Sequence, residues 1–448
     1  MKQQRIALVD GNSFYASCHM AFDPSLWRRP VVVLSNNDGC IVAANAQAKA
    51  LNKKLQRMNR HSLPEKDHLM FQPYFKLKAF LQAHNTAVFS SDYALYGEMS
   101  RRMHKIVGAF GRQQEVYSID ESFIELVGDE ANLSQQGQQI KQRVWQWLTL
   151  PVAVGMASTK TLAKLANHWA KKQVQFNGVL DYCALPEVAQ QTLLQQTPVG
   201  KVWGIGRQLR EKLNQQGIQT AWDLKQSHFE MLRRRYSIVV AKIARELNGQ
   251  ACLSIESVRP PKQQIVSSRS FRQPIETQSE LMSAIARFTA MAAEKLRAQG
   301  SVCQQISVSI RTNPFENAYP YYHPVYTLNL IEPTDHTLIL TKYARQALEQ
   351  IYQPGLPYKK AQVCLQKLTS KKGVQADLFH QRSISPAKSR QLMQAVDQIN
   401  QQYGRQTIKS ASSLSHSEAI LTGKRKQVHS MTYGIQGKRG EFPTVRSG

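Results

Sequence analysis

Short runs of apolar residues in the N-terminal third of the chain predict buried strands. Residues 6–9 are all apolar, and the run places Asp10 directly at its end. Residues 152–155 predict another short strand. Between them, residues 116–126 predict a strand whose apolar body is Val116, Ile119, Phe123, Ile124 and Leu126. We therefore expect a sheet in which one strand ends on a carboxylate.

Two adjacent carboxylates, Asp120 and Glu121, interrupt the strand predicted at 116–126. Inside an apolar strand they would repel each other and lose hydration, so they need a compensating cation. A surface turn, where water compensates, is the alternative, and the flanking apolar residues argue against it. Hard oxygen ligands suit Mg²⁺, and two such ions bridged by carboxylates align an attacking hydroxyl with a leaving pyrophosphate. Asp10, Asp120 and Glu121 are therefore candidate metal-binding catalytic residues.

The residues after the first strand predict a turn followed by a helix. Gly11 and Asn12 form the turn, and Ser13 can cap the helix that begins there. Backbone amides at such a helix start can hold a phosphate group. Phe14 and Tyr15 are the large planar side chains nearest the first carboxylate, with core packing as the alternative for both.

Helical and polar patterns alternate through the next part of the chain. Residues 45–49 lie among alanines and predict a helix, whereas residues 51 to about 68 are polar and basic and predict a loop. Residues 135–148 predict a longer helix. Ser158 or Thr159 can then cap a helix with an apolar stripe opposite a basic face, and such a face is usually solvated. The basic face carries Lys160, Lys164, Lys171 and Lys172.

A Gly-Ile-Gly sequence at residues 204–206 predicts the turn between two helices of a helix-hairpin-helix motif. Leucines and an isoleucine follow it at spacings typical of helices. The exposed backbone amides of such a turn bind a DNA phosphate without reading sequence. Gly204 and Gly206 are therefore candidate DNA-binding residues.

The C-terminal half of the chain predicts a second, separate sheet. Residues 251–263 are irregular and contain Pro260 and Pro261, which indicates a linker. Beyond it the order strand, helix, strand, strand, helix, strand predicts a four-stranded antiparallel sheet backed by two helices. The expected strands are 265–271, 306–310, 325–330 and 361–365, and the expected helices are 281–296 and 335–351.

The tail begins near residue 369 and contains a short docking-peptide pattern. Gln375, Leu378 and Phe379 form a Gln-x-x-Leu-Phe motif, in which two apolar residues stand out in a polar segment. A helix is predicted from Pro386 to near Gly404. The polar, basic residues after 405 are expected to be disordered unless a partner holds them.

The charge balance adds a class of partner. The 448 residues contain 58 lysines and arginines against 31 acidic residues, a formal net charge of +27. Such an excess suits a polyanion, with nucleic acid as the first candidate and an anionic membrane as the second. No apolar run is long enough to span a bilayer, and a strand that begins by Ile6 leaves no room for a signal peptide. The six scattered cysteines indicate a reducing cytosol, without a zinc site or a disulfide frame.

Several motifs give the chain a resemblance to the Y-family DNA polymerases, most closely to the UmuC-type subunit of bacterial SOS polymerases. The most specific are residues 10–18, 35–40 and 117–121, and residues 71–76 and 88–96 are also similar. The resemblance covers residues 1 to about 380 and returns weakly to the end. Two departures are His19, where the family usually has glutamate, and the 51–68 segment, which resembles an insertion.

The resemblance implies an α+β multidomain fold: a right-hand polymerase with palm, small fingers, helix-hairpin-helix thumb, βαββαβ little finger and a C-terminal tail. The expected palm is residues 1–27 and 86–170, the fingers 28–85 with an insertion at about 52–68, and the thumb 171–250. A linker at 251–263, a little finger at 264–368 and a tail at 369–448 with a clamp-binding peptide would follow.

The resemblance also implies roles for particular residues. Asp10, Asp120 and Glu121, with the carbonyl of Gly11, would hold two Mg²⁺ ions while a primer 3′-hydroxyl attacks the α-phosphate of a dNTP. Tyr15 would be the steric gate against a ribose 2′-hydroxyl. The nucleotide would contact Asn12, Ser13, Phe14, Tyr15, Lys49 and Lys171, and the DNA would contact Gly204, Gly206, Arg269, Arg272 and Arg311. An ordinary surface position is the alternative for each of the three arginines.

The implied partners are primer-template DNA, a UmuD′-like homodimer, a RecA filament and, through the motif at 375–379, the β sliding clamp. The expected activity is error-prone translesion synthesis in SOS mutagenesis, in the bacterial cytoplasm, nucleoid-associated when active and without a membrane partner. Two other classes stay open. A non-polymerising DNA-binding scaffold would have no use for the carboxylates and the aromatic gate, and a palm-type nucleotidyl cyclase would have no use for the helix-hairpin-helix and the clamp peptide.

Overall fold

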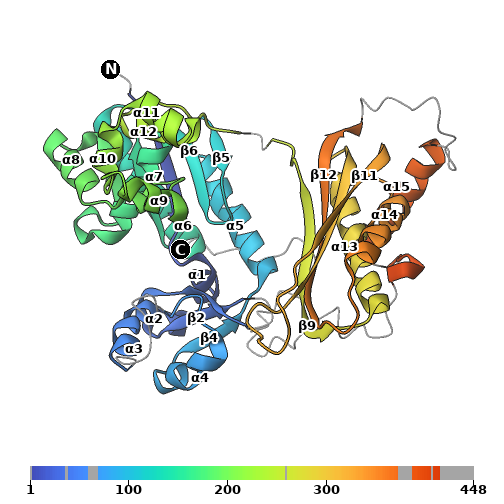
Figure 1. Cartoon of the computed structure of the whole chain (residues 1–448). Helices are drawn as coiled ribbons and strands as arrows, with labels where there is room; N and C mark the ends of the chain where they lie inside the picture. The colour runs from blue at the N-terminus through green and yellow to red at the C-terminus, as the bar shows by residue number, and fades with distance from the viewer. Residues whose placement is uncertain are drawn as a thin grey trace. The chain divides into compact units, whose positions relative to one another are not determined.

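The computed structural model describes residues 3–35, 39–58, 69–257, 260–371, 386–404 and 407–413. These residues divide into two units, the first ending at residue 257 and the second beginning at Pro260 (Figure 1). Each unit has its own main sheet and its own core. No helix in the described ranges is both long and apolar enough to cross a membrane.

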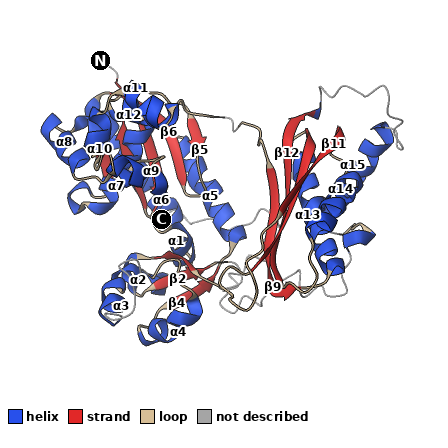
Figure 2. Ribbon diagram, viewed as in Figure 1, coloured by secondary structure: helices blue, strands red, loops and turns tan. Residues whose placement is uncertain are grey.

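The described strands of the first unit include a five-stranded sheet in the order β5-β6-β1-β7-β8. Two of its strands, β5 and β6, are labelled in Figure 2. β1 is central because it is apolar on both faces: Ile6 and Leu8 pack into one core cluster, Ala7 and Val9 into another. It pairs antiparallel with both β6 and β7. The strands predicted at 6–9 and 152–155 are thus confirmed. The bounds are β1 (Gln3–Gly11), β5 (Gln114–Val116), β6 (Glu121–Gly128), β7 (Val152–Ala157) and β8 (Val179–Asp181).

Helices cover both faces of this sheet. The helices α1 (Phe14–Met20), α5 (Tyr93–Gly108) and α6 (Glu130–Leu148) share the cluster of Ala7 and Val9, and α7 (Lys160–Lys172) shares the other. Thr159 caps α7 by accepting a hydrogen bond from the backbone N–H of Leu162. The helices predicted at 135–148 and after residue 159 are therefore confirmed, the first beginning earlier than expected.

The prediction of one strand across residues 116–126 is wrong. β5 ends at Val116 and β6 begins at Glu121, and the two strands pair antiparallel with Val116 opposite Ser122. Tyr117 and Ser118 both donate their backbone N–H groups to the carbonyl of Glu121, which closes a hairpin turn. The alternative of a surface turn solvated by water is not met either. Asp120 ends the turn, but Glu121 begins β6 with a side chain that is 17% exposed and paired with Lys164, so a cation compensates it.

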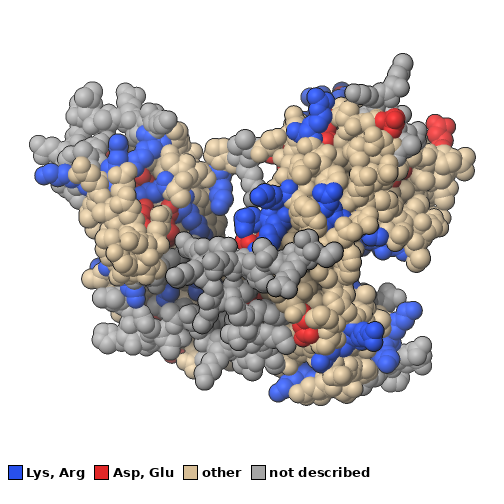
Figure 3. All heavy atoms as spheres, turned by 180° about the vertical axis from the view of Figure 1, so that it is seen from behind, with Lys and Arg blue, Asp and Glu red and all other residues tan. Residues whose placement is uncertain are grey.

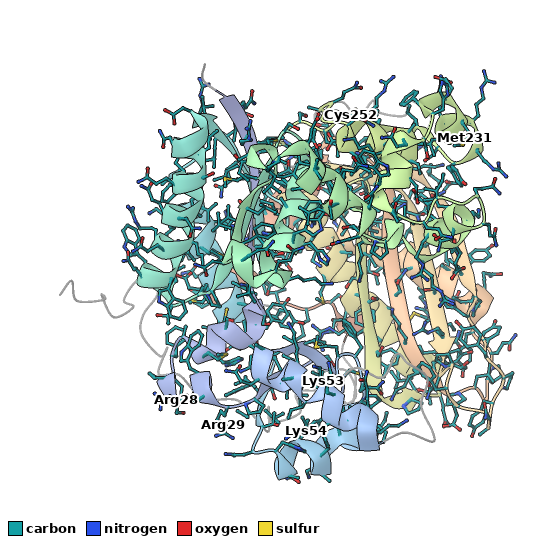
Figure 4. All side chains as sticks on the ribbon, turned by 90° about the vertical axis from the view of Figure 1, so that its left-hand side faces the viewer. Arg28, Arg29, Lys53, Lys54, Met231 and Cys252 are labelled. Carbon is teal, nitrogen blue, oxygen red and sulfur yellow. The ribbon has the colours of Figure 1, made fainter. Side chains whose placement is uncertain are left out.

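A second, three-stranded sheet of described strands follows the order β3-β2-β4. The helix expected at 45–49 is confirmed as α2, with Asn45 as its cap. The loop expected at 51–68 is wrong for residues 52–58, which form α3 because Leu51 and Leu55 give it a buried side; residues 59–68 lie outside the described ranges. Lys53 and Lys54 extend from α3 into solvent (Figure 4). The bounds are η1 (Pro24–Arg28), β2 (Val31–Leu34), β3 (Ile41–Ala44), α2 (Ala46–Ala50), α3 (Asn52–Met58), α4 (Tyr74–Ala83) and β4 (Ala87–Ser90).

A group of short helices completes the first unit. Leu213, Leu224 and Leu232 are buried in the same cluster as α7, so these helices share one core with the five-stranded sheet. The Gly-Ile-Gly turn lies between the 3₁₀ helix η5 and α9, so the first element of the motif is shorter and tighter than predicted. The bounds are α8 (Glu187–Gln195), η5 (Val199–Lys201), α9 (Arg207–Asn214), α10 (Ala221–Gln226), α11 (Phe229–Arg235) and α12 (Ile238–Leu247).

The described strands of the second unit form a four-stranded antiparallel sheet in the order β11-β10-β12-β9. Leu281 and Phe288 on one helix and Leu340 and Leu348 on the other are buried against it. The predicted β-α-β-β-α-β order is confirmed. The bounds are β9 (Ile265–Ile275), α13 (Gln278–Ala298), β10 (Ser301–Thr312), β11 (Val325–Thr334), α14 (Thr337–Ile351) and β12 (Tyr358–Ser370).

The described part of the tail holds α15 (Pro386–Gln402) and the 3₁₀ helix η7 (Ala411–Ser413). Arg297 on α13 donates to both carboxylate oxygens of Asp397 on α15, at 2.6 and 2.8 Å, and η7 packs against α13. The predicted helix is confirmed. The expectation of disorder after 405 is wrong for residues 407–413, because the second unit supplies a surface for them. Gln375, Leu378 and Phe379 lie outside the described residues.

Candidate active site

The backbone of the five-stranded sheet brings the three predicted carboxylates to one edge. Asp10 is the penultimate residue of β1, and its pairing partner across the sheet is Glu121, the first residue of β6. The N–H of Gly11 donates to the carbonyl of Asp120 at 2.9 Å, which fixes the turn against the end of β1. The three residues are therefore neighbours because of strand register.

Ser118 holds the turn that carries the acidic pair. Its hydroxyl donates to Oδ1 of Asp120 at 2.7 Å and accepts the backbone N–H groups of Asp120 and Glu121 at 3.3 and 3.0 Å. One side chain thus sets both the conformation of the turn and the direction of one carboxylate.

Lysines of α7 compensate the carboxylates. Lys171 lies 2.6 Å from Oδ1 of Asp10, and Lys164 lies 3.2 Å from Oε2 of Glu121. Lys160 is buried and pairs with Glu115 of β5. The prediction of a solvated basic face is therefore wrong for Lys160 and Lys164, whereas Lys171, which the resemblance assigned to the nucleotide, lies beside Asp10. In the described ranges, no group of three or more His, Cys, Asp or Glu side chains forms a ready metal site.

The protonation of Asp10 reflects this crowding. Burial raises the pKa of the Asp10 carboxyl from 3.8 to about 6; Lys171 opposes the shift, and Glu121 and Asp120 add to it. A carboxylate in that position is stabilised by added positive charge. The oxygen donors at this edge are therefore of the kind that a hard divalent cation prefers, provided that Lys171 releases Asp10.

A second group of polar atoms lies beside the carboxylates, at the start of α1. Ser13 is the N-cap residue in the left-handed region, with a φ of 49°, but its side chain caps nothing. Its hydroxyl instead accepts a hydrogen bond from Lys49 at 2.9 Å. Burial and the nearby Lys171 lower the pKa of Lys49, so these two lysines converge. Oδ1 of Asn12 is buried and has no hydrogen-bond partner among the described residues.

The two predicted aromatic residues have different surroundings. Phe14 is 3% exposed and belongs to the core, in line with the packing alternative. Tyr15 is half-buried and stacks on Tyr96 of α5, with ring centroids 4.3 Å apart and planes 13° apart. Tyr93 meets Tyr15 edge-on at 6.2 Å. Sequence reasoning missed Tyr93 and Tyr96, although both lie in the family-like segment 88–96.

The predicted DNA-binding glycines lie on the same unit. Gly204 has a φ of +89°, and a Cβ there would come within 2.7 Å of the Ile243 side chain, so glycine is required. Gly206 is the N-cap residue of α9. The preceding Trp203 donates from Nε1 to the Tyr117 hydroxyl at 3.2 Å, which links this turn to the hairpin of Asp120.

The predicted arginines belong to the second unit. Arg269 is exposed on β9, and the side chain of Arg272 lies outside what the structure describes. Arg311 is at the end of β10, and its Nε is buried without a hydrogen-bond partner among the described residues. The structure brings together the carboxylate, lysine and aromatic candidates, and these arginines belong to a different sheet.

Comparison with known families gives matches along most of the chain. The model of the impB/mucB/samB family matches residues 9–168, and the model of that family's C-terminal domain matches residues 262–378. A model named only as a domain of unknown function, DUF4113, matches residues 390–418, which include most of α15 and all of η7.

Individual proteins give the same picture. Protein UmuC of Salmonella typhimurium (strain LT2) is 40% identical over 405 residues, covering 90% of this chain and 92% of that protein. Protein MucB of Salmonella typhimurium is 39% identical over 443 residues, covering 98% and 100%. Among solved structures, the Y-family DNA polymerase chimera Dbh-Dpo4(243-245)-Dbh is similar with a TM-score of 0.60 at 17% identity, over 82% of this chain and 99% of that one. At that identity the structural match speaks for the fold alone.

Proposed function

We propose a mechanism and a set of partners from the premise that the chain belongs to the impB/mucB/samB family of UmuC-type Y-family polymerases. It is an error-prone translesion DNA polymerase, a nucleotidyltransferase that binds DNA and dNTPs. The scaffold and the cyclase are not favoured. The fold is the right hand of that family, with palm, fingers, thumb and little finger. The observation that carries the mechanism is the meeting of Asp10, Asp120 and Glu121 with Tyr15, Lys49 and Lys171 around the end of β1.

For the domain boundaries predicted at 1–27 and 86–170 for the palm and 28–85 for the fingers, we propose two changes. β4 (Ala87–Ser90) belongs with the fingers because it pairs with β2, and β8 (Val179–Asp181) belongs with the palm because it pairs with β7. α7 also runs unbroken to Lys172, so we move the boundary with the thumb from 170 to 181, the end of β8. The thumb then extends to 250. The linker of 251–263, the little finger of 264–368 and the tail of 369–448 stay as predicted from the sequence.

Y-family polymerases generally depend on divalent metal ions. For this chain we propose two Mg²⁺ ions, held by the carboxylates of Asp10, Asp120 and Glu121 and the carbonyl of Gly11. The lysine partners of Asp10 and Glu121 support this, since they show that the carboxylates at this edge of the sheet require positive charge nearby. Burial raises the pKa of Asp10, so its ionised form gains from an added cation. When bound, the ions would stabilise the attacking and leaving oxygens of the transfer.

The residues around the metal site bind and orient the nucleotide. When a nucleotide binds, Lys171 releases Asp10 and pairs with the triphosphate. Lys49 also contacts the triphosphate, so that two cations neutralise the phosphates. Asn12 and Ser13 offer polar atoms beside them, and Phe14 supports the site from the core. Tyr15 lies under the sugar as the gate against a 2′-hydroxyl.

Contacts with DNA are proposed to be mainly to phosphates. The net charge of +27 supports this, and Figure 3 shows lysine and arginine side chains on the surface. Gly204 and Gly206 would present backbone amides, and Arg269, Arg272 and Arg311 would add cations. Affinity for primer-template should then be sequence-independent, with log K falling steeply as log salt rises. A salt-independent affinity would contradict the proposal.

Primer extension with Mg²⁺ and dNTPs, on undamaged and abasic templates, tests the catalytic proposal. Wild type is compared with Asp120→Asn and with Glu125→Gln, an acid on the strand that follows the turn, where it contacts Gln4. Extension that is lost in the first variant and kept in the second supports the site. A wild type that binds DNA but extends nothing, with or without partners, supports the scaffold. Cyclic nucleotide formed from a nucleoside triphosphate without a primer supports the cyclase.

We also propose a UmuD′-like homodimer, a RecA filament and the β sliding clamp as partners, in the bacterial cytoplasm and on the nucleoid during activity. For the clamp, Leu378→Ala with Phe379→Ala should leave basal extension unchanged and remove stimulation by the clamp. Burying these side chains in a partner is worth roughly 1.5–3 kcal/mol each. If the double variant loses basal activity without clamp, the two residues instead fold back onto the little finger.

A further inference from the structure

Ring contacts hold Tyr15 in place before any nucleotide arrives. Its ring lies nearly parallel to that of Tyr96, at 4.3 Å and 13°, and edge-on to that of Tyr93, at 6.2 Å and 75°. Tyr96 is fully buried. One face of the Tyr15 ring is therefore backed by a side chain that the surrounding core prevents from moving.

His19 also contacts Tyr96. Nε2 of His19 and the Tyr96 hydroxyl are 2.9 Å apart, within a hydrogen bond, and the two rings meet edge-on at 84°. His19 is 2% exposed and stacks on Phe89 of β4, at 4.3 Å and 11°. Tyr15 and His19 are one helical turn apart on α1, so one face of that helix contacts Tyr96 twice.

The hydrogen bond joins two neutral groups. Burial lowers the pKa of His19 to about 4, with a smaller opposing effect of Asp92. Burial likewise raises the pKa of the Tyr96 hydroxyl well above its ordinary value. At neutral pH the imidazole is therefore uncharged and the phenol protonated, so neither group draws water or a counter-ion into this part of the core.

We propose that Tyr96, fixed by His19, positions the ring of Tyr15 and thereby sets how strongly the polymerase excludes ribonucleotides. The proposal rests on the role of Tyr15 as the gate. A side chain excludes a single hydroxyl by steric clash only if it cannot move aside. If Tyr15 lost the ring behind it, it could turn aside about its side-chain torsions and admit the extra oxygen. Tyr96 is thus a positioning residue that acts through Tyr15.

The test measures kcat/KM for an rNTP and the matching dNTP opposite the same template base. Tyr15→Ala, Tyr96→Leu, Tyr96→Phe and the double variant Tyr15→Ala with Tyr96→Leu are compared with wild type. Tyr96→Leu should raise the rNTP-to-dNTP ratio by roughly 2- to 10-fold, as expected for loss of one aromatic pair. Tyr96→Phe keeps the stack and loses the hydrogen bond, so its ratio should fall between wild type and Tyr96→Leu. The double variant should match Tyr15→Ala, because Tyr96 has no effect without the gate.

A matched control separates positioning from general loss of stability. Tyr182 is a buried tyrosine stacked on Trp169, at 5.5 Å and 27°, in the other core cluster. Tyr182→Leu should lower the melting temperature and leave the nucleotide ratio unchanged. If the role of Tyr96 were purely structural, Tyr96→Leu would slow incorporation of the rNTP and of the dNTP equally, and the ratio would not change.

The outcomes distinguish this inference from the proposed function. An unchanged ratio in Tyr15→Ala means that Tyr15 is not the gate, and both fail. A changed ratio in Tyr15→Ala with an unchanged ratio in Tyr96→Leu overturns the positioning role alone. If Tyr96→Leu does not fold, Tyr96→Phe and His19→Leu decide the matter, and wild-type ratios in both overturn the proposal.

Discussion

The two sides of the candidate site are held by different forces. On one side, Asp10 and Glu121 are fixed by ion pairs with Lys171 and Lys164, whose side chains are 28% and 18% exposed. On the other, Tyr15 is fixed by Tyr96, which is fully buried. An ion pair that reaches solvent can exchange its partner for another charge. A stacked ring in a packed core has no such exchange available.

This difference matches the tasks of the two sides. The carboxylate side must accept metal ions and a triphosphate, so its lysines have to release one anion and bind another. The aromatic side must exclude the 2′-oxygen of a ribose, so it works best when the ring of Tyr15 has a single position. Substitutions of charge should therefore change the rate, and substitutions of shape should change the choice of sugar.

The largest expected effect is on the carboxylate side. Asp120→Asn should lower the rate of primer extension by more than about 10²-fold, because preorganised charge is usually the largest catalytic contribution. Binding to primer-template should be unchanged. An asparagine oxygen can still accept the hydrogen bond from Ser118, so the turn should persist. Single-turnover extension and DNA affinity measured on one preparation check this, and near wild-type extension would remove Asp120 from the site.

The next effect is on the aromatic side. Tyr15→Ala should change the ratio of ribonucleotide to deoxyribonucleotide incorporation by at least about tenfold, while dNTP extension persists. The reason is removal of a clash rather than loss of a contact. If this variant lost dNTP extension as severely as Asp120→Asn, the contrast between a side for rate and a side for choice would be wrong.

The sequence predicted the parts of this site that depend on local pattern. The apolar run at 6–9 has to be a buried strand, and it places Asp10 at a sheet edge in whatever fold it joins. The β-α-β-β-α-β order of the second unit likewise follows from alternating periods. The hairpin at 117–120 escaped prediction because Ile119 and Phe123 continue the apolar pattern across it, while the hydrogen bonds of Ser118 decide the turn.

Long-range contacts were out of reach of the sequence pattern. A lysine on a helix face looks the same whether the face meets solvent or a carboxylate, so Lys164 and its partner Glu121 were not paired in advance. Tyr96 and His19 are 77 positions apart and meet only after α1 and α5 pack together. Neither tyrosine of α5 differs in pattern from an ordinary core residue.

The smallest expected effect is on the pH dependence of stability. The slope of the free energy of unfolding against pH should have opposite signs for the two sides of the site. Burial lowers the pKa of His19 from 6.5 to about 4; the Asp92 carboxylate opposes this shift, and the Tyr96 hydroxyl is the hydrogen-bond partner of the ring. Between pH 6.5 and 4 the unfolded chain binds a proton that folded His19 refuses, so the free energy of unfolding falls as the pH falls. The slope from this group is at most about 1.4 kcal/mol per pH unit.

Asp10 should act in the opposite direction. Its pKa is raised from 3.8 to about 6, so in chelator the folded carboxyl keeps a proton that the unfolded one releases, and the free energy of unfolding falls as the pH rises through this range. The two slopes oppose each other in wild type. Urea unfolding between pH 4 and 6.5 should then show, for His19→Gln, a free energy of unfolding that is larger at acid pH than near pH 6.5. For Asp10→Asn the free energy of unfolding should be larger near pH 6.5. Parallel curves for the two variants would show that the aromatic side and the carboxylate side do not differ in the way their buried groups are held.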